Sequence, residues 1–528
     1  MVAPASRATY WPWIALGLAG VTLVAFRLHA FDLPLEPDEC NYAYIGARLL
    51  AGDSLYVDVW DHQPFGVFAL FAGAIAVFGD EPHVFRWLAT AFSLGSLLLV
   101  FKILRRSSGD VAAVAGAMLF AIVSSDPGSA GEGCNREIFM CTFVLAGWYL
   151  AMRARGGSSA ALVGAGLALA VGSTLKTIVA VHWLLLAVWI AVCVWRESAG
   201  SRRWSVLVRS LGLFALGPVV VWGAVFGYFA VTDRFEPFVD AVFRFNLGYS
   251  GASEPFFARF ARFFAPIRHP FIFESALPLW VAGAVATGVL AWLARHTETA
   301  ALVLALVVAS FVAICLPGRF WPHYYYLLIP VLAIAVPMAI SHGVRVVAGD
   351  GRRRRISEGL LLGIVGGAVL MTQSTHYLSQ PPFGITVKRY NSRDFWGRGQ
   401  GENVRSVTDP GDSIFVFGND ASIYYYSKRR CASRYTMITG LAGGMSGAAQ
   451  RRKNLLDDLQ RDPPRLILVV FDEDAFDEWK AFLRAHYTEP VGWDYHDKTG
   501  EPIMFVLARK DRPINAIDWN WDRSSVGG

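Results

Sequence analysis

The chain has 528 residues, of which 54% are hydrophobic and 17% are charged. Soluble domains carry about 25% charged residues, so this composition excludes an ordinary soluble protein and indicates membrane spans. The net charge of +6 does not indicate nucleic-acid binding, because the basic residues form short clusters between apolar runs. The six cysteines lack the spacing of zinc ligands and imply no disulfide framework.

Apolar runs recur from residue 11 to about residue 372. We expect an α-helical polytopic membrane protein with about 11 to 13 spans, since one crossing needs about 20 apolar residues. The first run is interpreted as a retained span, because no cleavage site of a signal peptide follows it. Residues 64–79 form a further run that either crosses the membrane or only dips into it. The predicted crossings are 11–30, 84–103, 111–125, 137–152, 158–174, 177–195, 206–231, 274–294, 299–316, 323–341 and 356–372.

Basic clusters between these runs predict the orientation of the chain, because loops rich in Lys and Arg stay in the cytoplasm. The clusters lie at residues 102–106, 153–155, 196–203 and 345–355. This scheme places outside the cytoplasm the loops 31–62, 126–136, 232–273 and 317–322, together with the tail. Ionisable residues gather in these outer loops and not at mid-membrane, which favours surface chemistry over transport.

The tail is more polar and predicts a small α/β domain. We therefore expect two domains, a transmembrane body at 1–372 and a C-terminal domain outside the cytoplasm at 373–528. No glycine-rich phosphate loop and no nucleophile elbow occurs in the tail, which favours a cap or recognition role. Expected strands are 413–418, 466–471 and 502–508, and expected helices are 447–460 and 473–486.

Acidic residues follow the first span directly, in the motif Glu36-Pro37-Asp38-Glu39. Three carboxylates at a membrane surface repel one another, so they need a cation, a hydrogen-bonded site or a catalytic purpose. A solvated loop is the alternative. The next segment, Asn41 to Leu50, is typical of an amphipathic helix that lies in the membrane interface.

Residues 37–87 resemble the first outer loop of glycosyltransferase family 39, which includes protein O-mannosyltransferases and lipid A aminoarabinose transferases. The matching positions are Asp38, Glu39, Tyr42, Ala43, Gly52, Asp53, His62, Pro64, Gly79 and Arg86. Further matches are Asn135-Arg136-Glu137, Lys176, and the segments 318–330 and 410–435. The chain departs from the family at Gln63, where Lys is common. Glutamine donates a hydrogen bond but brings no charge, so phosphate binding then needs other cations, or the chain is inactive.

The resemblance implies a multi-span GT-C-type fold in a bacterial-type inner (plasma) membrane. It also implies transfer of a sugar from a polyprenyl-phosphate donor to an acceptor hydroxyl, with inversion. Asp38 is the expected general base, and Glu39 and Glu137 would orient the acceptor or bind Mg²⁺ or Mn²⁺, although no metal is certain. The expected donor phosphate-binding residues are Lys176, Arg319, His323 and Arg136. The expected substrate-binding residues are Tyr42, His62, Gln63, Asn246 and Tyr249.

Structural alternatives exist for two of these residues. Lys176 would also suit a snorkelling lysine at the interface, and His323 would suit a residue of an aromatic belt. Two other functions remain open for the whole chain. A transporter or flippase of lipid-linked saccharide would show an internal repeat and charges at mid-membrane, and the sequence has neither. An inactive binding member of the family is suggested by Gln63. The sequence identifies neither the sugar nor the acceptor, which could be protein, lipid or polysaccharide.

Overall fold

The computed structural model describes residues 10–198, 200, 202–250, 255–264, 271–349, 351–379, 381–390, 393–470, 475–495 and 502–514. The chain divides into two compact units. The helical unit comprises Met1–Phe31, Arg86–Val225 and Glu254–Pro381, and the α/β unit comprises Asp32–Phe85, Phe226–Ser253 and Pro382–Gly528. The expected domain boundary after residue 372 stays a prediction.

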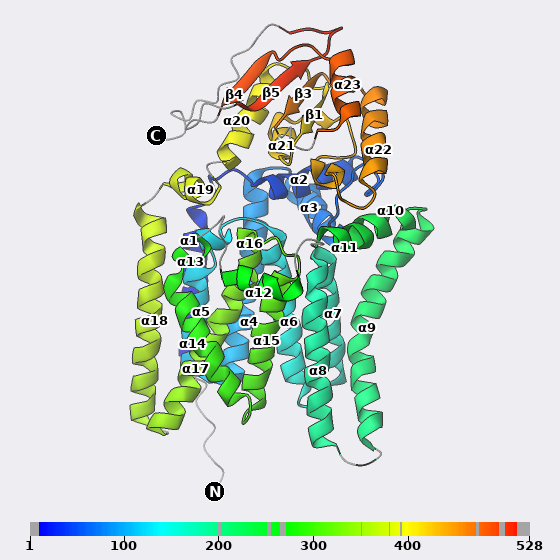
Figure 1. Ribbon diagram of the computed structural model, residues 1–528. Coiled ribbons are helices and arrows are strands. Elements are labelled where there is room, and N and C mark those ends of the chain that lie inside the picture. The colour runs from blue at the N-terminus through cyan, green and yellow to red at the C-terminus, as the bar shows by residue number, and fades with distance from the viewer. Residues whose placement is uncertain are drawn as a thin grey trace. The chain divides into compact units, whose positions relative to one another are not determined.

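Long apolar helices run side by side through the helical unit (Figure 1). Among the described residues, eight segments are long and apolar enough to cross a membrane: Trp11–Leu28 (α1), Pro82–Ser107 (α4), Arg136–Ala154 (α6), Thr177–Glu197 (η2 and α8), Arg202–Val231 (α9), Glu298–Cys315 (α15), Pro322–Ala348 (α16, η4 and α17) and Arg352–Ser379 (α18). Shorter apolar helices are Phe65–Phe78 (α3), Asp110–Val123 (α5), Ser159–Leu175 (α7) and Leu277–Leu293 (α14). Each predicted crossing coincides with one of these helices, so the predicted polytopic helical fold is confirmed.

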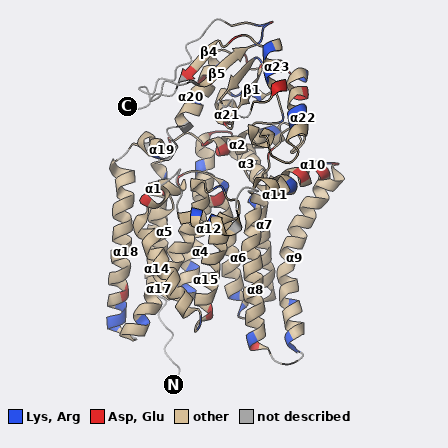
Figure 2. Ribbon diagram, in the orientation of Figure 1, with Lys and Arg blue, Asp and Glu red and all other residues tan. Residues whose placement is uncertain are grey.

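The predicted basic clusters lie at or beside helix ends, at one end of the helical unit. Arg155, after α6, forms ion pairs with Glu197 at the end of α8 and, at 3.0 Å, with Glu298 at the start of α15. Figure 2 shows Lys and Arg gathered at this end of α8, α9 and α18. The clusters therefore share one end of the bundle, as the positive-inside rule requires of loops on one side of a membrane.

Helices α7 and α9 approach each other closely at two glycines. A Cβ atom on Gly217 would lie 2.0 Å from the carbonyl carbon of Gly166, so only glycine fits at this crossing. Nearby, the rings of Trp183 and Phe214 stack with their centres 5.2 Å apart and join α8 to α9. Small residues commonly allow such close helix packing in membranes, where the hydrophobic effect does not drive helices together.

The α/β unit begins with two packed helices, Pro37–Leu50 (α2) and α3. A Cβ atom on Gly46 of α2 would lie 2.9 Å from the backbone nitrogen of Ala72, so the two backbones nearly touch. The run 64–79, whose status the sequence left open, thus forms a helix of this unit. Short helical segments follow later in the chain: Phe235–Val239 (α10), Asp240–Arg244 (η3) and Phe245–Tyr249 (α11).

The C-terminal part of this unit is a five-stranded mixed sheet with the order β2-β1-β3-β5-β4. Strand β1 is parallel to β2 and β3, whereas β5 is antiparallel to β3 and β4. The strands are Ser413–Phe417 (β1), Arg430–Cys431 (β2), Leu466–Val469 (β3), Gly492–Tyr495 (β4) and Pro502–Ala508 (β5). The helices are Pro382–Tyr390 (α19), Arg393–Ser406 (α20), Ser422–Ser427 (α21), Ala448–Arg461 (α22) and Asp477–His486 (α23).

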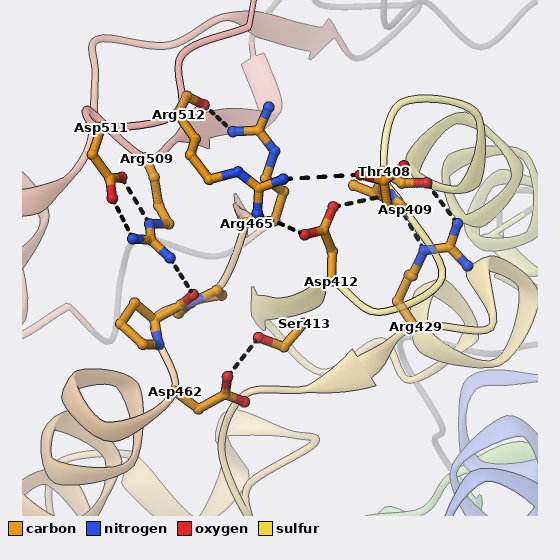
Figure 3. A network of polar contacts seen from close by, with 12 residues as sticks. Thr408, Asp409, Asp412, Ser413, Arg429, Asp462, Arg465, Arg509, Asp511 and Arg512 are labelled. Atoms are coloured by element: carbon orange, nitrogen blue, oxygen red, sulfur yellow. Dashed lines mark hydrogen bonds and ion pairs between the residues drawn. The ribbon is translucent and has the colours of Figure 1, made fainter.

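The predicted strands and helices of the tail correspond to β1, β3, β5, α22 and α23. The start of the predicted helix 473–486 falls partly outside the described residues. Trp479 of α23 covers one face of the sheet and stacks on Phe417, with ring centres 4.6 Å apart. At the end of the sheet where β1 begins, Arg512 donates to Asp412 at 2.9 Å and Arg429 donates to the carbonyl of Thr408 at 2.7 Å (Figure 3). These contacts join the segment before β1 to the segment after β5 and to the residue before β2.

Candidate functional site

The acidic motif forms the first turn of α2. The backbone N–H of Glu36 donates to the carboxylate of Glu39 at 3.1 Å, within a capping box, and Pro37 occupies the first helical position. Carboxylates are favoured here by the positive end of the helix dipole. Glu39 is fully buried and caps its own helix, whereas Asp38 is half-buried. The predicted interfacial helix is confirmed as a helix and begins at Pro37, earlier than expected.

A buried chain of hydrogen bonds leads from α2 to the loop before α3. Thr436 donates to the side-chain oxygen of Asn41 at 2.6 Å, and Asn41 donates to Asp61 at 2.6 Å. Asp61 in turn accepts from the backbone N–H of Gln63 at 2.7 Å. This network fixes the backbone of the loop that carries His62. Sequence reasoning assigned no role to Asn41 or Asp61, and the only signal was the position of Asp61 beside His62.

Three predicted substrate-binding residues lie around a fourth, His62. Asn246 donates to the His62 carbonyl at 2.6 Å, and the ring of Tyr249 lies 5.0 Å from the His62 ring, centre to centre. The side-chain amide of Gln63 is 2.8 Å from Nε2 of His62. The ring of Phe245 lies on the same imidazole, with centres 5.2 Å apart. We call this group, His62, Gln63, Asn246 and Tyr249, the histidine cluster.

Tyr42, the fifth predicted substrate-binding residue, has a packing environment. Its ring is 2% exposed and lies against Phe68 and Phe71 of α3, with ring centres 6.1 and 5.6 Å away. Tyr42 therefore takes part in the contact between α2 and α3, and its role in substrate binding stays a prediction.

In the helical unit, Lys176 ends α7 and binds the first turn of α6. Its ammonium donates to Glu137 at 2.5 Å and lies 3.4 Å from the centre of the Tyr324 ring. Both Lys176 and Glu137 are almost fully buried, at 5% and 1% exposure. Lysine and glutamate are buried in this way only when they are paired. The pair forms because α7 breaks at Lys176, whose backbone is extended.

Two more predicted residues adjoin this pair. Nε of Arg136 lies 3.6 Å from the same oxygen of Glu137, and His323 is close enough to influence Glu137 electrostatically. We call Arg136, Glu137, Lys176 and His323 the ionic cluster. Three of the four predicted phosphate-binding residues thus come together. The fourth, Arg319, is exposed in the loop after α15.

Arg27 orders the loop that leads into α6, and sequence reasoning missed it. It is buried in α1 and donates to the carbonyls of Gly131 and Gly133 at 2.7 Å each, and to Thr90 at 3.1 Å. These bonds hold the loop directly before the ionic cluster. The available signal was an arginine inside an apolar span, because such a charge needs partners within the protein.

The acidic residues do not fit a metal site. Within the described ranges, no group of three or more His, Cys, Asp or Glu side chains is placed to hold a metal ion. Glu137 is already bound by an ammonium, and Glu39 caps α2. A divalent ion would have to displace these partners, so no step of the chemistry below is assigned to a metal.

Comparisons with known proteins agree with this architecture. The family model described as dolichyl-phosphate-mannose-protein mannosyltransferase matches residues 62–222. The matched segment contains His62 and Gln63 of the histidine cluster and Arg136, Glu137 and Lys176 of the ionic cluster. A search of curated protein sequences found no match.

Solved structures share the fold at low sequence identity. The crystal structure of ArnT from Cupriavidus metallidurans bound to undecaprenyl phosphate is 16% identical, with a TM-score of 0.59 over 95% of this chain and 98% of that chain. The archaeal oligosaccharyltransferase AglB from Archaeoglobus fulgidus, in complex with an inhibitory peptide and a dolichol-phosphate, is 13% identical, with a TM-score of 0.56 over 97% and 75% of the two chains. The predicted GT-C-type fold and the resemblance to family 39 are therefore confirmed.

Proposed function

Because the chain is family 39-like and has the GT-C fold, we propose that it is a membrane glycosyltransferase with a polyprenyl-phosphate sugar donor. The sugar is a hexosyl or pentosyl unit, and its acceptor is a hydroxyl of a protein, lipid or polysaccharide. The similar proteins support the donor class, since the ArnT structure is bound to undecaprenyl phosphate, the AglB structure contains a dolichol-phosphate, and the family model describes a dolichyl-phosphate-mannose-protein mannosyltransferase.

The observation that carries this proposal is the buried ionic cluster. Arg136 and Lys176 bring two positive charges to a site with little water, where electrostatic attraction to a phosphate is stronger than at an exposed surface. A lysine ammonium has three donors, so Lys176 can bind Glu137 and a phosphate oxygen together. In this proposal Glu137 acts through Lys176, which it holds in place. Arg136 and Lys176 supply the positive charge for the phosphate, since Gln63 carries no charge.

The reaction needs a base for the acceptor hydroxyl, and we assign this role to Asp38. Its carboxylate takes the hydroxyl proton while the acceptor oxygen attacks the anomeric carbon. The bond from that carbon to the phosphate oxygen breaks, and its electron pair stays on the polyprenyl phosphate. Attack opposite the leaving group inverts the anomeric carbon. A positioned general base contributes roughly 10² to 10⁴ in rate.

The histidine cluster is proposed to bind the sugar. His62 and Tyr249 offer ring surfaces, while Gln63 and Asn246 offer polar groups, a combination typical of sites that orient polar ligands. We place the protein in a bacterial-type plasma membrane with the C-terminal domain outside the cytoplasm. The basic ends of the helical unit then face the cytoplasm, in agreement with the positive-inside rule.

The test is a transfer assay in membrane extracts that contain the lipid-linked sugars. Asp38→Asn keeps the size of the side chain but removes the base, so we expect sugar transfer to fall by about 10² or more. Asp32→Asn is the matched control, because Asp32 is an exposed residue of the same segment, and it should keep full transfer. Unchanged transfer in Asp38→Asn would remove Asp38 from the mechanism. Lipid movement without any new glycosidic bond would indicate a transporter.

A further inference from the structure

A polar pocket of about 220 Å³ lies within the α/β unit, apart from the histidine cluster. Its walls come from three segments that are distant in the sequence: the end of α2 with the following turn, the segment at β2, and the end of α22. Four arginines and four aspartates line it. Nothing in the chemistry proposed above uses these residues.

Ion pairs form about half of the wall. Arg48 binds Asp53 through two hydrogen bonds of 2.7 and 3.0 Å, and Arg434 binds Asp458 through two of 2.9 and 2.8 Å. Each arginine has five donors, so a forked pair holds the guanidinium in place and leaves donors for a ligand. Such ion pairs hold their side chains in place, and their arginines and carboxylates place donors and acceptors side by side in the pocket wall.

Asp58 also lines this pocket. One oxygen of its exposed carboxylate accepts the backbone N–H of Ser54 at 2.8 Å. Asp58 influences both Arg48 and Arg434 electrostatically, yet within the part of the chain that the structure describes it forms no ion pair with either. Asp58 and the two arginines line the same pocket, so one ligand hydroxyl can donate to Asp58 while another accepts from an arginine.

The balance of charge selects the ligand. An anion in this pocket would meet four carboxylates, and a cation would meet four guanidinium groups. A neutral molecule with several hydroxyls satisfies both kinds of wall. The pocket is smaller than the roughly 300–1,000 Å³ typical of drug-sized ligands, which suits one ring rather than several.

We propose that this pocket binds one neutral sugar unit of a carbohydrate acceptor. The proposal rests on the glycosyltransferase function and narrows its acceptor class. Arg48 lies ten residues after Asp38 on the same helix, a separation of about 15 Å along the helix axis. The bound unit is therefore not the one that reacts at Asp38, but a neighbour further along the acceptor chain.

Direct binding tests this inference without any transfer reaction. Purified full-length protein in lipid nanodiscs is titrated with D-glucose, D-galactose, D-mannose and N-acetylglucosamine, and separately with inorganic phosphate, and binding is followed by saturation-transfer NMR. We expect at least one neutral sugar to bind. Asp58→Asn should weaken that binding about tenfold, since hydrogen bonds to charged groups contribute about 1.5 kcal/mol or more. Glu402→Gln, in a surface ion pair of α20 outside the pocket, should leave binding unchanged.

Several results would overturn the proposal: no binding of any neutral sugar, phosphate binding in place of sugar binding, or equal sugar binding by Asp58→Asn and the unchanged protein. Asp38→Asn separates this inference from the proposed function. It should bind sugar normally while it loses transfer. Sugar binding by the unchanged protein, without any sugar transfer, would refute the proposed enzyme activity but not the sugar-binding pocket.

Discussion

Replacement of Lys176 by methionine tests the ionic cluster directly. Methionine keeps an unbranched side chain of similar length but removes the ammonium that lies 2.5 Å from Glu137. Glu137 is 1% exposed, and its second oxygen has no hydrogen-bond partner among the described residues. Removal of one partner of a buried ion pair typically costs about 3–5 kcal/mol. Arg136, 3.6 Å away, offsets part of this loss, so we expect a decrease in unfolding free energy of about 3 kcal/mol.

The measurement is denaturant unfolding in detergent micelles, followed by tryptophan fluorescence. The double variant Lys176→Met with Glu137→Gln should recover most of the lost stability, because no buried charge is left without its ammonium partner. It should not recover sugar transfer, since the phosphate-binding cation is still absent. Lys102→Met, at the basic end of α4, is the control and should change stability by no more than about 0.5 kcal/mol. Strictly additive losses in the double variant would refute the pairing, and normal transfer by it would refute the phosphate role.

Three further predictions concern the packing and the α/β unit. Gly217→Ala places a methyl group 2.0 Å from the backbone of Gly166 and should lower the thermal midpoint of unfolding. Gly212→Ala is the control, because a methyl group there meets open space, and it should leave the midpoint unchanged. Equal midpoints in the two variants would refute the close contact between α7 and α9. Burial raises the pKa of Asp458, but hydrogen bonds from Arg434 outweigh burial and leave it below its usual range. The pair therefore stabilises the fold above the unfolded pKa of about 3.9 and loses this effect as pH falls through the lower folded pKa. The difference in unfolding free energy between the unchanged protein and Asp458→Asn should be largest at neutral pH and shrink below about pH 4; a difference independent of pH would contradict this. Asn41→Ala removes the hydrogen bonds that Asn41 forms with the buried Asp61 and Thr436 and should cost about 1–3 kcal/mol in denaturant unfolding, so an unchanged unfolding curve would contradict the network.

The membrane helices could be predicted because hydrophobic length is a local property of the sequence. The strands β1, β3 and β5 were also predictable, since each is a short run of mostly apolar residues. The strand β2 has two residues and β4 has four, too few for an alternating pattern, and their places depend on pairing with distant strands. The sequence therefore predicted three of the five strands.

Candidate site residues could be predicted where they belong to a sequence motif, but not where contacts between distant segments position them. The contact between Asn246 and His62 joins residues 184 positions apart, and the sequence indicated only that both lie in predicted outer loops. Glu39 caps α2, and its expected catalytic role stays a prediction, because the sequence motif does not distinguish a catalytic carboxylate from a helix cap. Arg27 and Asn41 act through buried hydrogen bonds to distant segments, which no local pattern reveals.

The proposed reaction breaks the bond between a sugar and a polyprenyl phosphate. The most direct measurement uses the purified protein in vesicles that contain membrane lipid-linked sugars and acceptor extract, and counts free polyprenyl phosphate and new glycosidic bonds together. We expect one lipid phosphate to be released for each glycosidic bond formed, and we expect phosphate release and bond formation both to stop in Asp38→Asn. Movement of intact sugar-linked lipid across the bilayer, with neither product, would contradict it.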